Sequence, residues 1–293
     1  MSNFQPGILA EIPPQSRYLT FTGIPGGASR DVIQQFCREQ DGSATVVGFG
    51  ASLVLALGGR INGLRSFPHL AVAGVDVPST PAALWCWLRG DDRGELLHRS
   101  RHIIHALSPA FRLQGSLDAF RYDHGRDLTG YEDGTENPTG DDALQAATVQ
   151  GTGTSLDGSS FVAVQQWVHD LNRFEALSAT AQDHTIGRRK SDNQELDDAP
   201  PSAHVKRTAQ EGFEPHAFIL RRSMPWIDAG DAGLVFVAFG KSFDAFEALL
   251  NRMAGADDGI TDALFTFTRP ISGSYYWCPP VRRGQLNVSG LGL

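Results

Sequence analysis

The sequence predicts an α+β fold in which antiparallel sheets carry helices on their outer faces. Strand-like and helix-like segments follow the order β-α-β-β-α-β in each half of the 293-residue chain. Two polar segments, 123–158 and 187–216, interrupt this pattern and lack the apolar spacing of either element. The repeated order is that of the ferredoxin-like (split βαβ) arrangement, so we expect two such units in one chain.

In the first half, the pattern predicts strands at 17–22, 45–49, 84–88 and 118–122, and helices at about 29–39 and 92–107. In the second half, it predicts strands at 160–167, 217–221, 234–239 and 275–278, and helices at about 171–182 and 242–253. The strand at 84–88 shows the alternation well, because Trp85 and Trp87 flank Cys86. The helix at 242–253 has an apolar stripe that includes Phe246 and Leu250.

These elements divide the chain into three parts. Residues 1–122 form the expected N-terminal unit, and residues 159–293 form the C-terminal unit. Residues 123–158 connect the two units, and residues 187–216 are a polar insertion inside the second. Because long polar segments on a sheet scaffold are often functional, we expect the site to be built from these two.

The composition excludes several classes of protein. With 41% hydrophobic and 20% charged residues, the chain has enough apolar material for a core. A net charge of −8 argues against a nucleic-acid partner. No apolar run is long enough to span a membrane, and the N-terminus lacks the features of a secretory signal. Three distant cysteines in apolar surroundings indicate free thiols, so we expect a cytoplasmic protein.

The most informative segment is 126–140, RDLTGYEDGTENPTG. It contains three Gly, one Pro and four acidic residues, so neither a core strand nor an amphipathic helix fits it. Gly130 and Gly134 allow a sharp turn around Asp133 and a close approach of the backbone to a ligand. The loop therefore indicates a carboxylate held at a fixed place. An acidic surface loop or a Ca2+ loop is the alternative, although the spacing is not that of an EF-hand.

Two later residues are candidates to act with Asp133. His204 lies in the polar insertion, where no amphipathic pattern explains it as a core residue. Arg221 ends an expected strand, and a guanidinium there serves either as an ion-pair partner for a buried acid or as an anion-binding group. A dinucleotide site at residues 48–53 is disfavoured, because Leu53 replaces the third glycine of that motif.

With these residues in place, the chain resembles the dye-decolourising peroxidases, which are haem enzymes built from two ferredoxin-like halves. GYEDGTENP is similar to the G-x-x-D-G motif of that family. His204 follows Asp133 by 71 residues and Arg221 follows His204 by 17, as the family's proximal histidine and distal arginine do. The resemblance covers nearly the whole chain and is closest to the short, bacterial, cytoplasmic branch.

The resemblance implies one haem b (iron protoporphyrin IX) per chain, in a pocket mainly within the second unit. His204 would be the iron ligand, with a carboxylate on its other ring nitrogen. Asp262 is the first choice for that carboxylate, and Asp257 and Asp258 are rivals. Asp133 and Arg221 would be the catalytic residues on the opposite, distal face. The remaining residues expected to contact the cofactor are Arg188, on a propionate, and Phe236, Gly134 and Ser223.

The function implied is a peroxidase that uses H2O2 to form a ferryl species, which oxidises small aromatic donors such as dyes and phenolics in one-electron steps. The alternative is a haem-binding or haem-handling protein, including one that releases iron from haem, with incidental peroxidase activity. We expect a homo-oligomer, although no residue indicates how it forms. The apolar tail at 285–293 weakly resembles tails that package family members in encapsulin shells.

Overall fold

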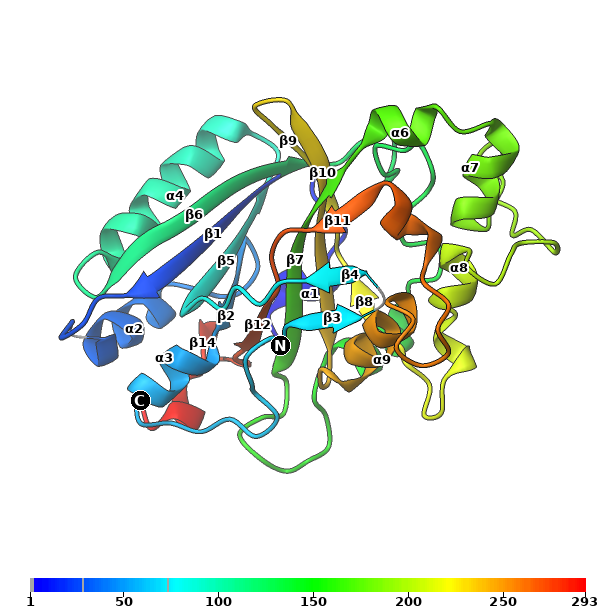
Figure 1. The fold of residues 1–293 in the computed structure, drawn as a ribbon. Coiled ribbons are helices and arrows are strands. Elements are labelled where there is room, and N and C mark those ends of the chain that lie inside the picture. The colour runs from blue at the N-terminus through cyan, green and yellow to red at the C-terminus, as the bar shows by residue number, and fades with distance from the viewer. Residues whose placement is uncertain (1–2, 28, 73) are drawn as a thin grey trace.

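The computed structural model describes residues 3–27, 29–72 and 74–293, and one ten-stranded antiparallel sheet runs through both halves of the chain (Figure 1). Its strands lie in the order β6-β1-β5-β2-β12-β7-β10-β8, with β11 paired to β7 and β9 paired to β10. Within each half, the four principal strands therefore follow the spatial order fourth-first-third-second. The predicted α+β class with antiparallel pairing is confirmed.

The elements of the N-terminal half are α1 (Pro6–Leu9), β1 (Gln15–Gly23), α2 (Ser29–Arg38), β2 (Thr45–Phe49), α3 (Ala51–Ala56), β3 (Leu70–Val72), β4 (Val75–Val77), β5 (Leu84–Gly90), α4 (Arg93–Leu107) and β6 (Phe111–Phe120). The main correction concerns β6, which begins at Phe111 rather than at residue 118. It is an edge strand with exposed polar residues, so its apolar alternation is too weak for the sequence to predict its first half.

The elements of the C-terminal half are α5 (Gly140–Ala147), β7 (Ser160–His169), α6 (Leu171–Glu175), α7 (Ala179–Ile186), α8 (His204–Arg207), η1 (Gln210–Gly212), β8 (Leu220–Arg221), β9 (Met224–Asp228), β10 (Asp231–Gly240), α9 (Asp244–Met253), η2 (Ala263–Thr266), β11 (Thr268–Pro270), β12 (Ser274–Cys278), β13 (Val281–Arg282), β14 (Gln285–Leu286) and η3 (Ser289–Leu291).

Two predicted elements of this half were wrong in extent. The single helix at 171–182 is two helices, α6 and α7, because the Ser178 side chain accepts a hydrogen bond from the Ala181 amide and begins a new helix. The strand at 217–221 is reduced to β8, because Gln210 takes the hydrogen bonds of the Ala217 and Ile219 amides. A sheet neighbour would otherwise have accepted them.

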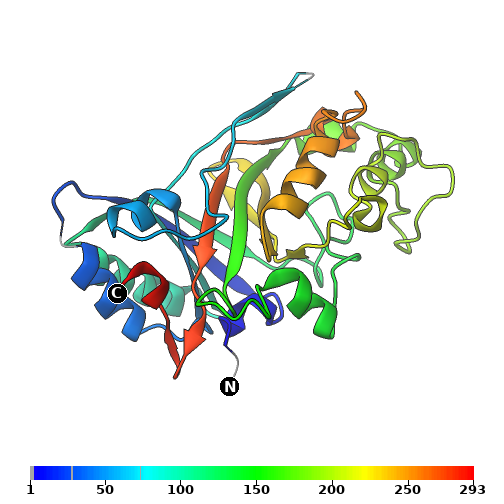
Figure 2. The same cartoon turned by 90° about the horizontal axis from the view of Figure 1, so that it is seen from below.

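The two faces of the sheet are buried in different ways. One face carries the outer helices α2, α4 and α9 (Figures 1 and 2). Apolar side chains of the strands and helices form a buried cluster there. On the other face, side chains from the two halves pack against one another, with stacked Tyr18, Trp85 and Tyr276 among them. All five tryptophans of the sequence lie in strands and are at most 6% exposed. The sheet is therefore a rigid support for the polar segments at its ends.

The seam between the two half-sheets depends on a side chain. Strands β2 and β12 pair at a single position, Phe49 opposite Trp277. The fully buried Gln5 supplies further hydrogen bonds there. Its Oε1 accepts from the Val47 amide at 2.8 Å, and its Nε2 donates to the carbonyls of Val47 and Pro279 at 2.9 and 3.1 Å.

The C-terminal tail is folded onto the rest of the chain. Leu286, Val288 and Leu291 are buried in the core, and Arg30 donates a hydrogen bond to the Gly292 carbonyl. Among the residues that the structure describes, no helix combines the length and the apolar character needed to cross a bilayer.

Replacing Gln5 by alanine is expected to lower the free energy of unfolding by about 1–3 kcal/mol, because the buried Val47 amide loses its partner. The measurement is urea unfolding followed by tryptophan fluorescence. Gln35→Ala is the matched control, since Gln35 is exposed and its side chain donates to that of Glu39. Equal losses in the two variants would show that the Gln5 hydrogen bonds do not stabilise the seam.

Candidate active site

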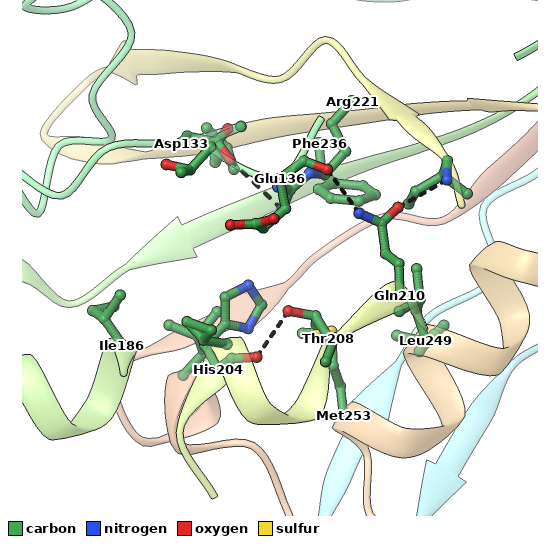
Figure 3. A pocket seen from close by; sticks show the side chains of 18 of the residues that line it. Asp133, Glu136, Ile186, His204, Thr208, Gln210, Arg221, Phe236, Leu249 and Met253 are labelled. Atoms are coloured by element: carbon green, nitrogen blue, oxygen red, sulfur yellow. Dashed lines mark hydrogen bonds and ion pairs between the residues drawn. The ribbon is translucent and has the colours of Figure 1, made fainter. Parts of the chain in front are cut away.

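A large cavity lies between the polar segments and the second half of the sheet. Figure 3 shows His204 on one side of it and Asp133, Arg221 and Phe236 on the opposite side. The cavity encloses about 1380 Å³ of empty space, counted out to its open mouth. Its lining residues all fall between 132 and 268, which places it in the connecting segment and the second half.

Apolar side chains form much of the cavity wall. Most come from β7, α7, α8, β10, α9 and η2, and together they suit a flat, apolar ligand of large area. The apolar lining residues are Trp167, Ile186, Val205, Ala209, Ile219, Leu234, Phe236, Phe246, Leu249, Leu250, Met253 and Leu264.

His204 is oriented by a buried carboxylate. It is the first residue of α8, and its Nδ1 lies 2.7 Å from Oδ2 of Asp262, whose side chain is fully buried. The other carboxylate oxygen of Asp262 accepts the Leu264 amide at 2.9 Å, which fixes the carboxylate in turn. With Nδ1 engaged, Nε2 is the ring nitrogen left to bind a ligand in the cavity.

The two rival carboxylates are engaged elsewhere. Asp258 forms an ion pair with Arg207 at 2.7 Å, and Asp257 lies 3.9 Å from Arg252. Of the three predicted candidates, Asp262 is the one that contacts His204.

Asp133 and Arg221 face each other across the distal side of the cavity. Nη1 of Arg221 lies 3.8 Å from Oδ1 of Asp133, an ion pair without a direct hydrogen bond. Among the described residues, no group accepts a hydrogen bond from the buried Nε of Arg221. The arginine therefore has hydrogen-bonding capacity to spare for a ligand.

Burial dominates the ionisation of Asp133. Removal from water raises the pKa of its carboxyl group, the positive charge of Arg221 opposes this, and the negative charge of Asp127 adds to it. The net direction of the pKa shift is upward. Asp133 therefore keeps its proton to a higher pH than an exposed aspartate does.

Two side chains that the sequence did not identify hold the distal residues in place. Asn137 accepts from the Arg221 amide at 2.8 Å and donates to its carbonyl at 3.1 Å. Gln210 accepts from the Ile219 amide and donates to the Glu136 carbonyl, both at 2.9 Å (Figure 3). The Asn-Pro dipeptide at 137–138 marks a turn, but only the fold reveals its partner.

Gly134 is required for this anchoring. Its φ is +83°, and a Cβ built there would lie 2.8 Å from Nδ2 of Asn137, the amide that holds Arg221. Gly130 also has a positive φ, of +85°. The two glycines of the motif thus allow the turns of the loop. Gly134 also lines the cavity.

Arg188 lines the cavity. Its guanidinium donates to Glu136 at 2.5 Å and to the Asn193 carbonyl at 3.0 Å, with Glu195 at 3.6 Å. A carboxylate of a bound ligand would share this guanidinium with Glu136, whose side chain is mostly exposed.

Ser223 does not line the large cavity. It lies at a small neighbouring pocket that also touches Asp133 and Arg221, and its hydroxyl accepts the Val237 amide at 3.4 Å. Within the described residues, no three His, Cys, Asp or Glu side chains converge as a metal-binding cluster. A metal at this site would therefore have to bring most of its own ligands, as the iron of a haem does.

Comparison with known proteins assigns the family. The profile described as "Dyp-type peroxidase, C-terminal" matches residues 124–283, more than half of the chain. The chain belongs to the Dyp-type peroxidase family. Its curated relatives include the dye-decolorizing peroxidase of Mycobacterium tuberculosis, which is 29% identical over 94% of this chain and 88% of its own length.

Solved structures of Dyp-type peroxidases have the same fold. A variant of DypB from Rhodococcus jostii RHA1 in complex with heme is 26% identical and has a TM-score of 0.86. The match covers 93% of this chain and 94% of the DypB chain. The encapsulated DyP-type peroxidase of Mycobacterium smegmatis is 25% identical, also with a TM-score of 0.86, over 96% of both chains. Family membership makes this Dyp-type peroxidase an oxidoreductase acting on peroxide.

The raised pKa of Asp133 predicts a pH-dependent effect on stability. Its contribution to stability is fully present below the unfolded-state pKa of about 3.9 and is lost as the pH rises through the higher folded-state value. Asp133→Asn should therefore become more stable relative to the parent as the pH rises. Thermal unfolding between about pH 4 and pH 8 measures this, with the exposed Asp142→Asn as control. A variant that instead loses stability relative to the parent as the pH rises would show that ionisation of Asp133 stabilises the fold.

Proposed function

We propose that the chain is a haem-dependent peroxidase that uses H2O2 to oxidise small aromatic donors, such as dyes and phenolics, in one-electron steps. One observation carries the proposal. A histidine backed by a buried carboxylate faces an aspartate–arginine pair across a single large apolar cavity. The heme-bound DypB of similar fold supports it.

The residues present fit one haem b per chain. His204 would ligate the iron through Nε2, while Asp262 holds Nδ1 and increases the basicity of the ring. Phe236 and the other apolar wall residues would pack on the porphyrin, and Arg188 would bind a propionate. When bound, the haem supplies the chemistry that cleaves the peroxide O–O bond and passes oxidising equivalents to donors.

Asp133 is assigned the proton transfer within the peroxide. Its carboxylate takes the proton from one peroxide oxygen and returns it to the other, so that the second oxygen leaves as water. Burial raises the pKa of Asp133, so it favours the protonated carboxyl group that exists after the first proton transfer. The charge of Arg221 keeps the ionised form accessible.

Arg221 is assigned the stabilisation of negative charge on the departing oxygen. Its Nε is a buried donor without a partner among the described residues, and its charge lies within a largely apolar cavity. Donors fixed before the reaction in such a site stabilise developing charge more than mobile water does. Asn137 fixes the backbone of Arg221, which limits the positions that the guanidinium can take.

We infer that residues 1–122 and 159–293 are two ferredoxin-like units joined by 123–158. The support is the strand order, which is fourth-first-third-second in each half with antiparallel pairing throughout. Their edge strands β2 and β12 merge the two units into one sheet.

Packaging in an encapsulin shell through the C-terminal tail has less support. The Mycobacterium smegmatis relative is encapsulated. Here, however, Leu286, Val288 and Leu291 are buried against the chain's own core. The tail would have to leave that core to bind another protein, at the cost of exposing three apolar side chains.

His204→Ala is expected to abolish the haem Soret band of the purified protein, because the residue supplies the iron ligand. Ultraviolet–visible spectra of the parent and the variant, with haem added to both, make the measurement. His184→Ala is the control, since His184 is part-exposed and pairs at 3.7 Å with the exposed Asp198. An unchanged spectrum in His204→Ala would overturn the assignment of the ligand.

Asp133→Asn and Arg221→Leu are each expected to slow the reaction with stoichiometric H2O2 by roughly 10²-fold or more, because each removes one of the two distal functions. Stopped-flow absorbance at several pH values measures the rate, with Asp142→Asn as control. An unchanged rate in Asp133→Asn would remove Asp133 from the mechanism and leave Arg221 as the chief catalyst. An unchanged rate in both would refute the distal assignment.

A further inference from the structure

The helix that carries His204 is too short to hold its own position. α8 is a single turn, His204–Arg207, and Ala203, which precedes it, caps it with no side-chain hydrogen bond. A turn of this length is not stable by itself in water, because its few backbone hydrogen bonds do not offset the lost conformational freedom. Contacts with the rest of the chain must therefore hold α8, and with it the His204 ring, in place.

Arg207, the last residue of α8, makes a buried set of such contacts. Its side chain is 6% exposed and forms a bidentate pair with the Asp258 carboxylate, at 2.8 Å from Nη1 and 2.7 Å from Nη2. Its Nε and Nη2 also donate to the Arg252 carbonyl, at 3.2 and 2.7 Å. By contrast, Lys206 on the same turn pairs with Glu195 where both side chains are exposed. The proposed mechanism leaves Arg207 without a role.

Arg207 and Asp262 are attached to the same end of α9. Arg207 donates to the carbonyl of Arg252, and the Asp262 amide donates to the carbonyl of the next residue, Met253, at 2.8 Å. These carbonyls belong to the last turn of α9, where a guanidinium also interacts favourably with the helix dipole. The helix that carries the histidine and the carboxylate that orients it are therefore held from adjacent peptide groups.

The contacts of α8 also share one geometry. His204 and Arg207 are three residues apart, which places their side chains on neighbouring positions of one helical face. Asp258 and Asp262 come from the segment that follows α9, and each of them binds one of these two side chains. A single contact would let α8 pivot about it, whereas two contacts fix both the position and the rotation of the turn.

The end of α9 is also part of the cavity wall. Leu249 and Met253 line the cavity on the side of His204 (Figure 3). Because Arg207 ties α8 to this helix, the His204 ring keeps a fixed position relative to the surface on which a flat ligand would rest. Arg207 itself is not among the residues that line the cavity, so it acts on a ligand there only through α8.

Resting on the proposed haem ligation by His204, we propose that Arg207 is a positioning residue for that ligand. By fixing α8 to the end of α9, it keeps Nδ1 of His204 at hydrogen-bond distance from Asp262 and leaves Nε2 for the iron. A carboxylate on its other nitrogen makes an imidazole a stronger metal ligand, and loss of such support commonly lowers metal affinity by roughly 10- to 100-fold.

The test compares the parent with Arg207→Met, which keeps a long side chain but removes the charge and the hydrogen-bond donors. With haem bound, we expect the iron–histidine stretching band of the ferrous protein, measured by resonance Raman spectroscopy, to move to lower wavenumber. Haem release to excess apomyoglobin should become roughly 10-fold faster. Arg207→Lys keeps the charge but cannot form the bidentate pair, so it should restore part of both properties.

Arg17→Met is the matched control. Arg17 lies in β1 and forms a similar bidentate pair with Asp118, at 2.5 and 2.7 Å, and neither residue lines the cavity. Its loss should lower the stability to urea by an amount comparable to that in Arg207→Met. It should leave the Raman band and the rate of haem release at the parent values.

Asp258→Asn is the second variant, in case Arg207→Met does not fold. The Asp258 side chain is 42% exposed, so the change weakens the same pair from its solvent side and should shift both properties in the same direction by a smaller factor. Parent values of the Raman band and of haem release in the folded variants would overturn the positioning role and leave Arg207 a purely structural residue. A parent protein that binds no haem would instead refute the proposed function.

Discussion

The two hydrogen bonds between the Asn137 side chain and the Arg221 backbone determine the geometry of the site. They tie a loop that is poor in apolar residues to the end of a buried strand, and so fix the distance between Asp133 and Arg221. Gln210 provides a second tie, from the segment that follows His204 to the same loop and to Ile219, the residue before β8. Hydrophobic burial alone could not hold such a loop, because it has few apolar side chains to bury.

Three aspartates, one on the cavity wall and two behind it, are placed in three different environments. Asp262 is fully buried and occupied by His204 and a backbone amide. Asp127 is stabilised in its charged form by His169 and Thr129. Asp133 faces the cavity, where burial outweighs the charge of Arg221. The neighbours of an aspartate thus decide whether it orients a histidine, stays charged or has a raised pKa.

The sequence was a good guide to regular elements and a poor guide to irregular ones. Strands such as β5 and helices such as α9 have strong apolar periodicity, so their positions followed from pattern. The start of the edge strand β6 was not predicted, because the strand is polar. The division of the helix at Ser178 was not predicted either, because it depends on a local side-chain cap. The spacing of Asp133, His204 and Arg221 indicated the site. Asn137 and Gln210 act through Arg221 and Glu136, partners 84 and 74 residues away in the chain, which no local pattern reveals.

The burial of every tryptophan in the sheet makes the protein its own optical probe. Indole rings shielded from water emit at shorter wavelength than exposed ones, so the emission colour of the folded chain reports whether its two halves are still packed together. Trp167 also lies on the cavity wall. A strongly absorbing chromophore beside it would drain the excited state by energy transfer. Dimming of the emission without a change in its colour would therefore signal occupancy of the cavity, and a shift to longer wavelength would signal opening of the sheet.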